Sequence, residues 1–175
     1  MTRSWIVSPV SSRRSPDGSI FKVEPTGEFE RLKIELRAET AGWTGIVIED
    51  KGAAVAAQLA DRGTPVLWCP AGRSEASVAR AAGARLQPVA ELVELLDSSD
   101  IVLSICPPAA AEELANEVAK HRFTGIFVDA NAISPERASR IGCRTTESGA
   151  RFVDGAIIGP PPRDGRTARL YLNGG

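Results

Sequence analysis

The sequence predicts an α/β domain, namely a doubly wound parallel sheet with helices on both faces. Short β-branched runs, of which residues 44–48 and 100–106 are examples, alternate with stretches that have the composition of helices. This alternation is typical of parallel strands joined by right-handed helical crossovers. In such sheets ligands bind at the carboxyl ends of the strands, near the point where the strand order reverses. The residues that follow each strand are therefore the candidates for a functional site.

The composition is that of a globular protein large enough for one ordinary domain with a sizeable core. Of its 175 residues, 43% are hydrophobic and 25% are charged, which excludes a disordered or fibrous chain. The 21 Lys and Arg residues nearly balance the 22 Asp and Glu residues, so the formal net charge is −1. A protein that binds nucleic acid needs a clustered cationic surface. We therefore expect no nucleic-acid partner, although a local phosphate site stays open.

Neither a membrane span nor a metal site is expected. No apolar run approaches the roughly 20 residues that cross a bilayer. Cys69, Cys106 and Cys143 are widely spaced and form no CxxC pair, and His121 is the single histidine. These residues make no zinc-ligand group. A reduced, cytoplasmic protein is the simplest interpretation.

The chain divides into two parts of different character. Residues 1–42 are interpreted as an extension that is partly mobile, because residues 1–18 are rich in Ser, Arg and Pro. Residues 21–24 and 32–36 alternate apolar and charged side chains, a pattern that suits a β-hairpin. Residues 43–175 are interpreted as the main domain.

The main domain opens with a strand and a helix. Residues 44–48 are short and β-branched, as a buried parallel strand should be. An Ala-rich helix follows over residues 52–60 and stops at Gly63. Residues 65–69 then form the second strand, and a loop over residues 70–73 leaves its carboxyl end.

The middle of the domain repeats this alternation. Ser74 can cap a helix that Gly83 ends. The next elements are a short strand over residues 84–87, a helix over residues 90–96 and a strand over residues 100–106. Pro107 and Pro108 stop that strand.

The last elements continue in the same order. The sequence predicts a helix over residues 109–120 and a strand over residues 125–129. Ser134 and Pro135 then open a helix, as a capping serine followed by proline at the first helical position. A strand over residues 151–158 follows and leads into a Gly-Pro turn.

These segments resemble the nucleotide-binding domain of the 6-phosphogluconate dehydrogenase and 3-hydroxyacid dehydrogenase superfamily. The resemblance covers residues 43–175 and is carried by five pieces in the right order. They read GAAVAAQL from Gly52, AGRS from Ala71, SDIVLSICPP from Ser99, VDANAISP from Val128 and FVDGAIIGP from Phe152. The resemblance implies a Rossmann-like fold and an NAD(P)-dependent oxidoreductase.

The loop after the first strand departs from the dinucleotide-binding pattern. That pattern, G-x-G-x-x-G, lets the backbone approach the pyrophosphate at a helix N-terminus. Counted back from Gly52, the first two glycines are replaced by Val47 and Glu49. A glutamate about 4 Å from a phosphate would cost on the order of 4 kcal/mol. Two alternatives remain open: Asp50, Lys51 and Gly52 hold the phosphates, or Glu49 and Asp50 fill the anion site themselves.

The loop after the second strand bears on the choice between NAD and NADP. NAD-binding proteins place an acid there for the ribose hydroxyl, whereas residues 68–71 contain none and Arg73 and Ser74 follow. An arginine at a capped helix start suits a 2′-phosphate, and the resemblance also implies NADP. The alternative is a solvated arginine.

Further site residues follow from the resemblance. It implies that the loop of Cys106, Pro107 and Pro108 lies along the cofactor. Cys106 itself is expected to be a small buried residue and no nucleophile, because no histidine is placed to activate it. Asn131 would contact the nicotinamide or substrate, or else satisfy its own backbone. A substrate loop would contain Asp154, Gly155 and Gly159.

The resemblance also implies a catalytic lysine on a long helix that follows this domain. Lys120, the last lysine, does not match that position. We therefore expect a truncated chain whose helical domain comes from a homo-oligomer or a partner chain. Three alternatives remain open: an NADP-linked oxidoreductase completed in this way, a degenerate module in which NADP binding is weak or lost, and an interaction protein that uses an exposed apolar surface.

Overall fold

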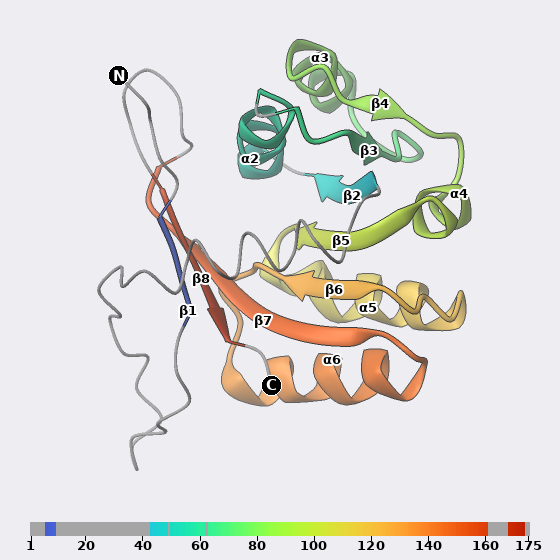
Figure 1. The fold of residues 1–175 in the computed structure, drawn as a ribbon, viewed down its shortest axis with the longest axis vertical. Coiled ribbons are helices and arrows are strands. Elements are labelled where there is room, and N and C mark those ends of the chain that lie inside the picture. Colours follow the sequence, from blue (N-terminus) through green and yellow to red (C-terminus); the bar gives the residue numbers. More distant parts are fainter. Residues whose placement is uncertain (1–5, 10–42, 49, 62, 161–167, 174–175) are drawn as a thin grey trace.

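The computed structural model describes residues 6–9, 43–48, 50–61, 63–160 and 168–173, which form one sheet with helices on both sides (Figure 1). Its strands are β1 (Ile6–Pro9), β2 (Trp43–Ile48), β3 (Val66–Trp68), β4 (Gln87–Pro88), β5 (Ser99–Ile105), β6 (Ile126–Asp129), β7 (Arg151–Ile158) and β8 (Arg169–Asn173). Its helices are α2 (Asp50–Ala60), α3 (Glu75–Gly83), α4 (Leu92–Asp97), α5 (Ala111–Lys120) and α6 (Pro135–Glu147), and a 3₁₀ turn, η1 (Pro108–Ala110), precedes α5.

The strand order confirms the doubly wound architecture. Across the sheet the order is β1-β8-β7-β6-β5-β2-β3-β4. Strands β2 and β5 are parallel neighbours in the centre. From this pair the chain winds one way through β3 and β4 and the other way through β6 and β7. The order therefore reverses between β2 and β5, which is where such a sheet binds its ligands.

The edge beyond β7 differs from the purely parallel sheet that the sequence predicted. Strand β8 pairs with β7 in the antiparallel direction, and β1 pairs with β8 in the parallel direction. The run from Leu170 to Leu172 is too short to show a strand pattern by itself, so no strand was predicted there. Residues 6–9, which were assigned to a mobile extension, form β1. The hairpin expected within residues 21–36 lies outside the described residues.

Two apolar clusters, one on each face of the sheet, form the core. On one face the alanine-rich sides of α2 and α3 pack against Val66, Trp68 and Leu103. On the other face α4, α5 and α6 pack against Val102 and Phe127. Since successive strand residues point to opposite faces, each central strand supplies both clusters. The burial of both faces explains the continuous apolar runs in the sequence.

The end of α3 corrects the strand that was predicted over residues 84–87. Gly83 is the last helical residue, and Arg85 adopts the left-handed conformation at φ 57°. The N–H of Leu86 then bonds to the carbonyl of Ala81 at 3.1 Å, which closes the helix end over a buried leucine. Residues 84–86 therefore belong to a helix end, and β4 begins only at Gln87.

Candidate functional site

Loops from several parallel strands meet at the carboxyl edge of the sheet. Helices α2, α3 and α6 and the turn η1 begin at this edge, after β2, β3, β6 and β5 respectively. The structure places most of the sequence-predicted site residues there: Asp50, Lys51, Gly52, Arg73, Ser74, Cys106, Pro107, Pro108 and Asn131. The predicted cofactor residues thus surround the point where the strand order reverses.

The first loop is short. Strand β2 ends at Ile48 and helix α2 begins at Asp50. Gly52 is buried in the first turn of α2. The N–H groups of this turn are at the carboxyl edge, where a helix N-terminus attracts an anion. Glu49 lies outside the described residues, so both alternatives for this loop remain predictions.

The loop after β3 exposes Arg73 at the start of a capped helix. Gly72 has a φ of +70°, which a glycine adopts without strain. The N–H of Arg73 donates to the carbonyl of Pro70 at 3.0 Å, which closes the turn. Ser74 caps α3, because its Oγ accepts a hydrogen bond from the N–H of Ser77 at 3.3 Å. The Arg73 side chain is exposed beside this helix N-terminus.

Asn131 connects the ends of β5 and β6 through its side chain. Its Oδ1 accepts a hydrogen bond from the N–H of Cys106 at 2.8 Å. Its Nδ2 lies 3.0 Å from the Oγ of Ser104 and 3.2 Å from the Oδ2 of Asp129. Because a backbone N–H can only donate, the bond to Cys106 fixes which end of the amide is oxygen. Asn131 is 5% exposed, so this network is nearly closed to solvent.

Asp129 supports the same network from the end of β6. One carboxylate oxygen accepts the N–H of Asn131 at 2.9 Å and the other accepts its side-chain amide. Burial raises the pKa of Asp129 above its ordinary value. The two bonds from Asn131 and the charge of Arg137 oppose that rise, since they favour the carboxylate form.

A second carboxylate, Asp154, lies next to Asp129 across the sheet. The two aspartates are register partners on the parallel strands β6 and β7. Burial raises the pKa of Asp154, and the neighbouring charge of Asp129 raises it further. Sequence reasoning did not find this pair. The available signal was that each aspartate stands in a strand pattern and is followed by a small residue, in VDA and in VDG.

The predicted substrate loop is divided by the structure. Asp154 and Gly155 lie inside β7, where they pair with Asn173 and Leu172 of β8. A Cβ on Gly155 would lie 3.0 Å from the Cδ2 of Leu172, so the glycine serves close strand packing and forms no turn. Only Gly159, with a φ of +124°, follows the strand.

Other reactive side chains lie apart from the network around Asn131, although Cys69 directly follows β3 at the carboxyl edge. Lys120 and His121 are exposed at the C-terminal end of α5, and the helix begins at the carboxyl edge of the sheet and runs away from it. Cys143 is exposed on α6. Cys69 donates a weak hydrogen bond to the carbonyl of Ala90 at 3.7 Å. None of these side chains joins the network around Asn131.

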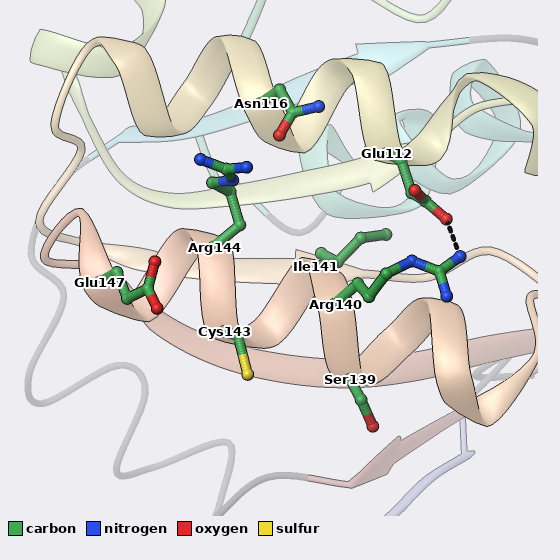
Figure 2. Close-up of a pocket in the computed structure, with 8 residues that line it drawn as sticks. All are labelled: Glu112, Asn116, Ser139, Arg140, Ile141, Cys143, Arg144 and Glu147. Carbon is green, nitrogen blue, oxygen red and sulfur yellow. Dashed lines mark hydrogen bonds and ion pairs between the residues drawn. The ribbon is translucent and has the colours of Figure 1, made fainter.

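A groove between α5 and α6 lies on the outer surface of the molecule (Figure 2). Its volume is about 460 Å³, and charged residues of both signs line it, among them Glu112, Arg140 and Arg144. Glu112 accepts hydrogen bonds from Arg140 at 2.6 Å and Arg137 at 2.8 Å. These bonds hold the pKa of Glu112 below its ordinary value. No sequence-predicted site residue lines this groove.

The described part of the chain shows neither a metal-ligand cluster nor a membrane-spanning helix. Within it, no three His, Cys, Asp or Glu side chains gather as metal ligands would. No helix in the same residues has the length and apolar character needed to span a bilayer.

Curated relatives match the chain in part. A probable trehalose-phosphate phosphatase of Sinorhizobium fredii is 62% identical over 47 residues, which cover 27% of this chain and 18% of that protein. An uncharacterized 28.5 kDa protein of Methanothermus fervidus is 36% identical over 96 residues, which cover 54% of this chain and 36% of that protein. The chain therefore spans a minor part of each of these relatives.

Solved structures share the fold. A conserved protein of unknown function, described as structurally similar to 3-hydroxyacid dehydrogenases, has a TM-score of 0.66 and 30% identity over 74% of this chain and 48% of its own. A 3-hydroxyisobutyrate dehydrogenase of Mycobacterium tuberculosis has a TM-score of 0.61 and 19% identity, over 69% and 42% of the two chains. An imine reductase from a Pseudomonas species has a TM-score of 0.60 and 15% identity, over 70% and 43%.

The family follows from the match to a family model. The model described as the NAD binding domain of 6-phosphogluconate dehydrogenase matches residues 48–164, which is more than half of the chain. The matched residues run from the end of β2 past the end of β7, and so include the loops at the carboxyl edge. The chain belongs to the family of NAD-binding domains of 6-phosphogluconate dehydrogenase.

Proposed function

We propose that this domain binds NADP(H), a small-molecule dinucleotide, at the carboxyl edge of its sheet. The observation that carries the choice of NADP is the position of Arg73, which is exposed beside the capped N-terminus of α3. A guanidinium and a helix N-terminus together favour a phosphate dianion. Residues 68–72, which precede Arg73, contain no acid for a ribose 2′-hydroxyl.

The strand order suggests how the dinucleotide lies. A doubly wound sheet binds one mononucleotide half on each side of the reversal point, with the pyrophosphate at the first helix. Asp50, Lys51 and Gly52 would then face the pyrophosphate from the start of α2. Arg73 and Ser74 would face the adenosine half, beyond β3. The loop of residues 106–108 and Asn131 would face the nicotinamide half, over β5 and β6.

Catalysis by this family requires more than cofactor binding. Hydride transfer to or from a hydroxy acid needs a general base on the hydroxyl. Lys51 is assigned to the pyrophosphate, and Lys120 and His121 lie at the far end of α5. We therefore place the base outside the described residues, in a helical part of the active enzyme or in a partner chain. The substrate class proposed for that enzyme is a small hydroxy acid, and Asp154 and Gly159 are candidates for its binding.

A titration of the purified chain tests this proposal. Calorimetry with NADPH and NADH should give tighter binding of NADPH. Saturation at about 100 times Kd adds about 2.7 kcal/mol of stability, which corresponds to a rise in Tm of roughly 5–10 °C for a domain of this size. Tighter binding of NADH than of NADPH would overturn the assignment of NADP.

A second candidate function is a degenerate module that has lost the dinucleotide. The observation that favours it is Glu49, which stands where the family pattern requires glycine. Such a module would act as a binding or interaction protein. If neither NADPH nor NADH at millimolar concentration gives a heat of binding or a shift in Tm, the result would support this candidate. Replacement of Glu49 with glycine would then be expected to restore binding.

A further inference from the structure

The amide of Asn131 has its hydrogen-bonding capacity directed at the protein. Its oxygen accepts from the N–H of Cys106, and its nitrogen faces the Oγ of Ser104, the Oδ2 of Asp129 and, at 3.6 Å, the Sγ of Cys106. The nitrogen has two hydrogens for these three acceptors, so it has no further donor for a ligand, and only one lone pair of the amide oxygen stays open. The residue that the resemblance assigns to ligand contact is therefore fully used by the protein as a donor.

The hydrogen bonds of Asn131 connect the ends of two neighbouring strands, β5 and β6. Ser104 and Cys106 lie 27 and 25 residues away in sequence. The N–H of Ala130 also donates to the carbonyl of Ser104 at 2.9 Å. Consequently the start of the loop after β5 is attached to the start of the loop after β6 by both backbone and side chain. The carboxylate of Asp129 fixes Asn131 in this position, because it accepts hydrogen bonds from the backbone N–H and the Nδ2 of Asn131.

We propose that Asn131 is a positioning residue, which together with Asp129 sets the backbone of the loop from Cys106 to Pro108 against the nicotinamide half of the dinucleotide. This inference rests on the proposed dinucleotide function and deepens it. Buried, charge-assisted hydrogen bonds resist displacement, so the loop is held in place before the ligand arrives. Preorganisation of this kind lowers the cost of binding.

The proposal predicts a specific pattern among three variants. Asn131→Asp keeps the acceptor for the N–H of Cys106 but puts a carboxylate against Asp129. Asp129→Asn removes the charge that holds the amide. In the double variant Asp129→Asn/Asn131→Asp the amide and the carboxylate exchange places. The side chain at position 129 then donates a hydrogen bond to the side chain at position 131. Asn116→Asp, a change of an exposed asparagine on α5, is the matched control.

The first readout requires no ligand. In a Cys69→Ser/Cys143→Ser background, the rate of thiol labelling reports only on Cys106, which is partly buried at the start of the loop. Asn131→Asp should raise that rate by about tenfold, the scale of one lost hydrogen bond. The double variant should return it to within about twofold of the parent, because coupled residues compensate each other. Asn116→Asp should leave it unchanged.

The second readout distinguishes positioning from general stability. At a temperature where all variants are folded, Asn131→Asp should weaken NADPH binding by about tenfold. Affinity for 2′-phospho-ADP-ribose, which lacks the nicotinamide, should change by less than about twofold if separate halves of the sheet bind the two halves of the cofactor. The double variant should recover NADPH affinity.

Each outcome decides between the two proposals. If the parent protein binds no dinucleotide, the proposed function fails, and Cys106 labelling alone still tests the pair. If NADPH binds and Asn131→Asp leaves its affinity unchanged, or weakens both ligands equally, the positioning role is overturned. Failure of the double variant to recover would overturn the pairing with Asp129. Should Asn131→Asp not fold, Ser104→Ala removes one acceptor of the same amide and should raise the labelling rate; an unchanged rate would overturn the proposal.

Discussion

Asp129 and Asp154 are register partners on the adjacent parallel strands β6 and β7, so that two carboxylates lie side by side on one face of the sheet. Asp129 is fully buried, and its carboxylate accepts two hydrogen bonds from Asn131. Asp154 is only partly buried. Burial and the charge of Asp129 both raise the pKa of Asp154. Ionised Asp154 is therefore a source of instability at neutral pH.

Replacement of Asp154 with asparagine should stabilise the domain at pH 7, by about 0.2–1 kcal/mol, the scale of a like-charge contact across strands. A carboxyl whose folded pKa is raised stabilises the fold below its unfolded pKa, and that contribution is lost as pH rises through the folded pKa. The advantage of Asp154→Asn should therefore disappear below pH 3.8, the ordinary pKa of aspartate. Urea unfolding across this pH range measures it, with Asp100→Asn, an exposed aspartate of β5, as control.

Gly125 is required by its close contact with the backbone. A Cβ at this position would lie 2.3 Å from the carbonyl oxygen of Asp100 and 2.4 Å from the ring of Phe123. Since a backbone carbonyl in a sheet cannot yield, Gly125→Ala should lower the free energy of unfolding by about 2 kcal/mol. Gly83→Ala is the matched control, because a Cβ there meets nothing within 4 Å. Equal stabilities of the two variants in chemical denaturation would contradict the packing described here.

Arg73 should discriminate between the two cofactors. Arg73→Ala removes one charged contact, so NADPH affinity should fall by about 2 kcal/mol, or roughly thirtyfold. NADH affinity should stay the same, since NADH has no 2′-phosphate. Arg144→Ala, an exposed arginine on α6, is the matched control. Calorimetric titration of both cofactors measures the effect, and an equal loss for the two would show that Arg73 does not bind the phosphate.

Local sequence patterns predicted the order of strands and helices well because each element carries its own signal. The β-branched run of β5 ends at two prolines, and Ser134 caps α6 as expected, with its Oγ 3.4 Å from the N–H of Arg137. Strand β8 could not be predicted, since a short run of apolar residues gains its structure from β7. The end of α3 was predicted correctly at Gly83, whereas the start of β4 was misplaced, because residues 84–86 close the helix end with Arg85 in the left-handed conformation.

The site was predicted less completely, for a different reason. The topology of a wound sheet brings the loops of Arg73, Cys106 and Asn131 to one edge, and this could be inferred from element order alone. The partners of Asn131 depend on strand register and on rotamers, which no local pattern specifies. The pairing of Asp129 with Asp154 has the same origin. Sequence reasoning therefore located the loops and missed the hydrogen bonds between them.

Hydrogen–deuterium exchange with and without NADPH tests the location of the binding site most directly. We expect slower exchange in the segments at the carboxyl edge, namely residues 50–54, 70–77, 104–108 and 130–133. We expect no change along the outer groove between α5 and α6, where Glu112 and Arg140 form an ion pair. Protection confined to that groove, or to no part of the carboxyl edge at saturating NADPH, would contradict it.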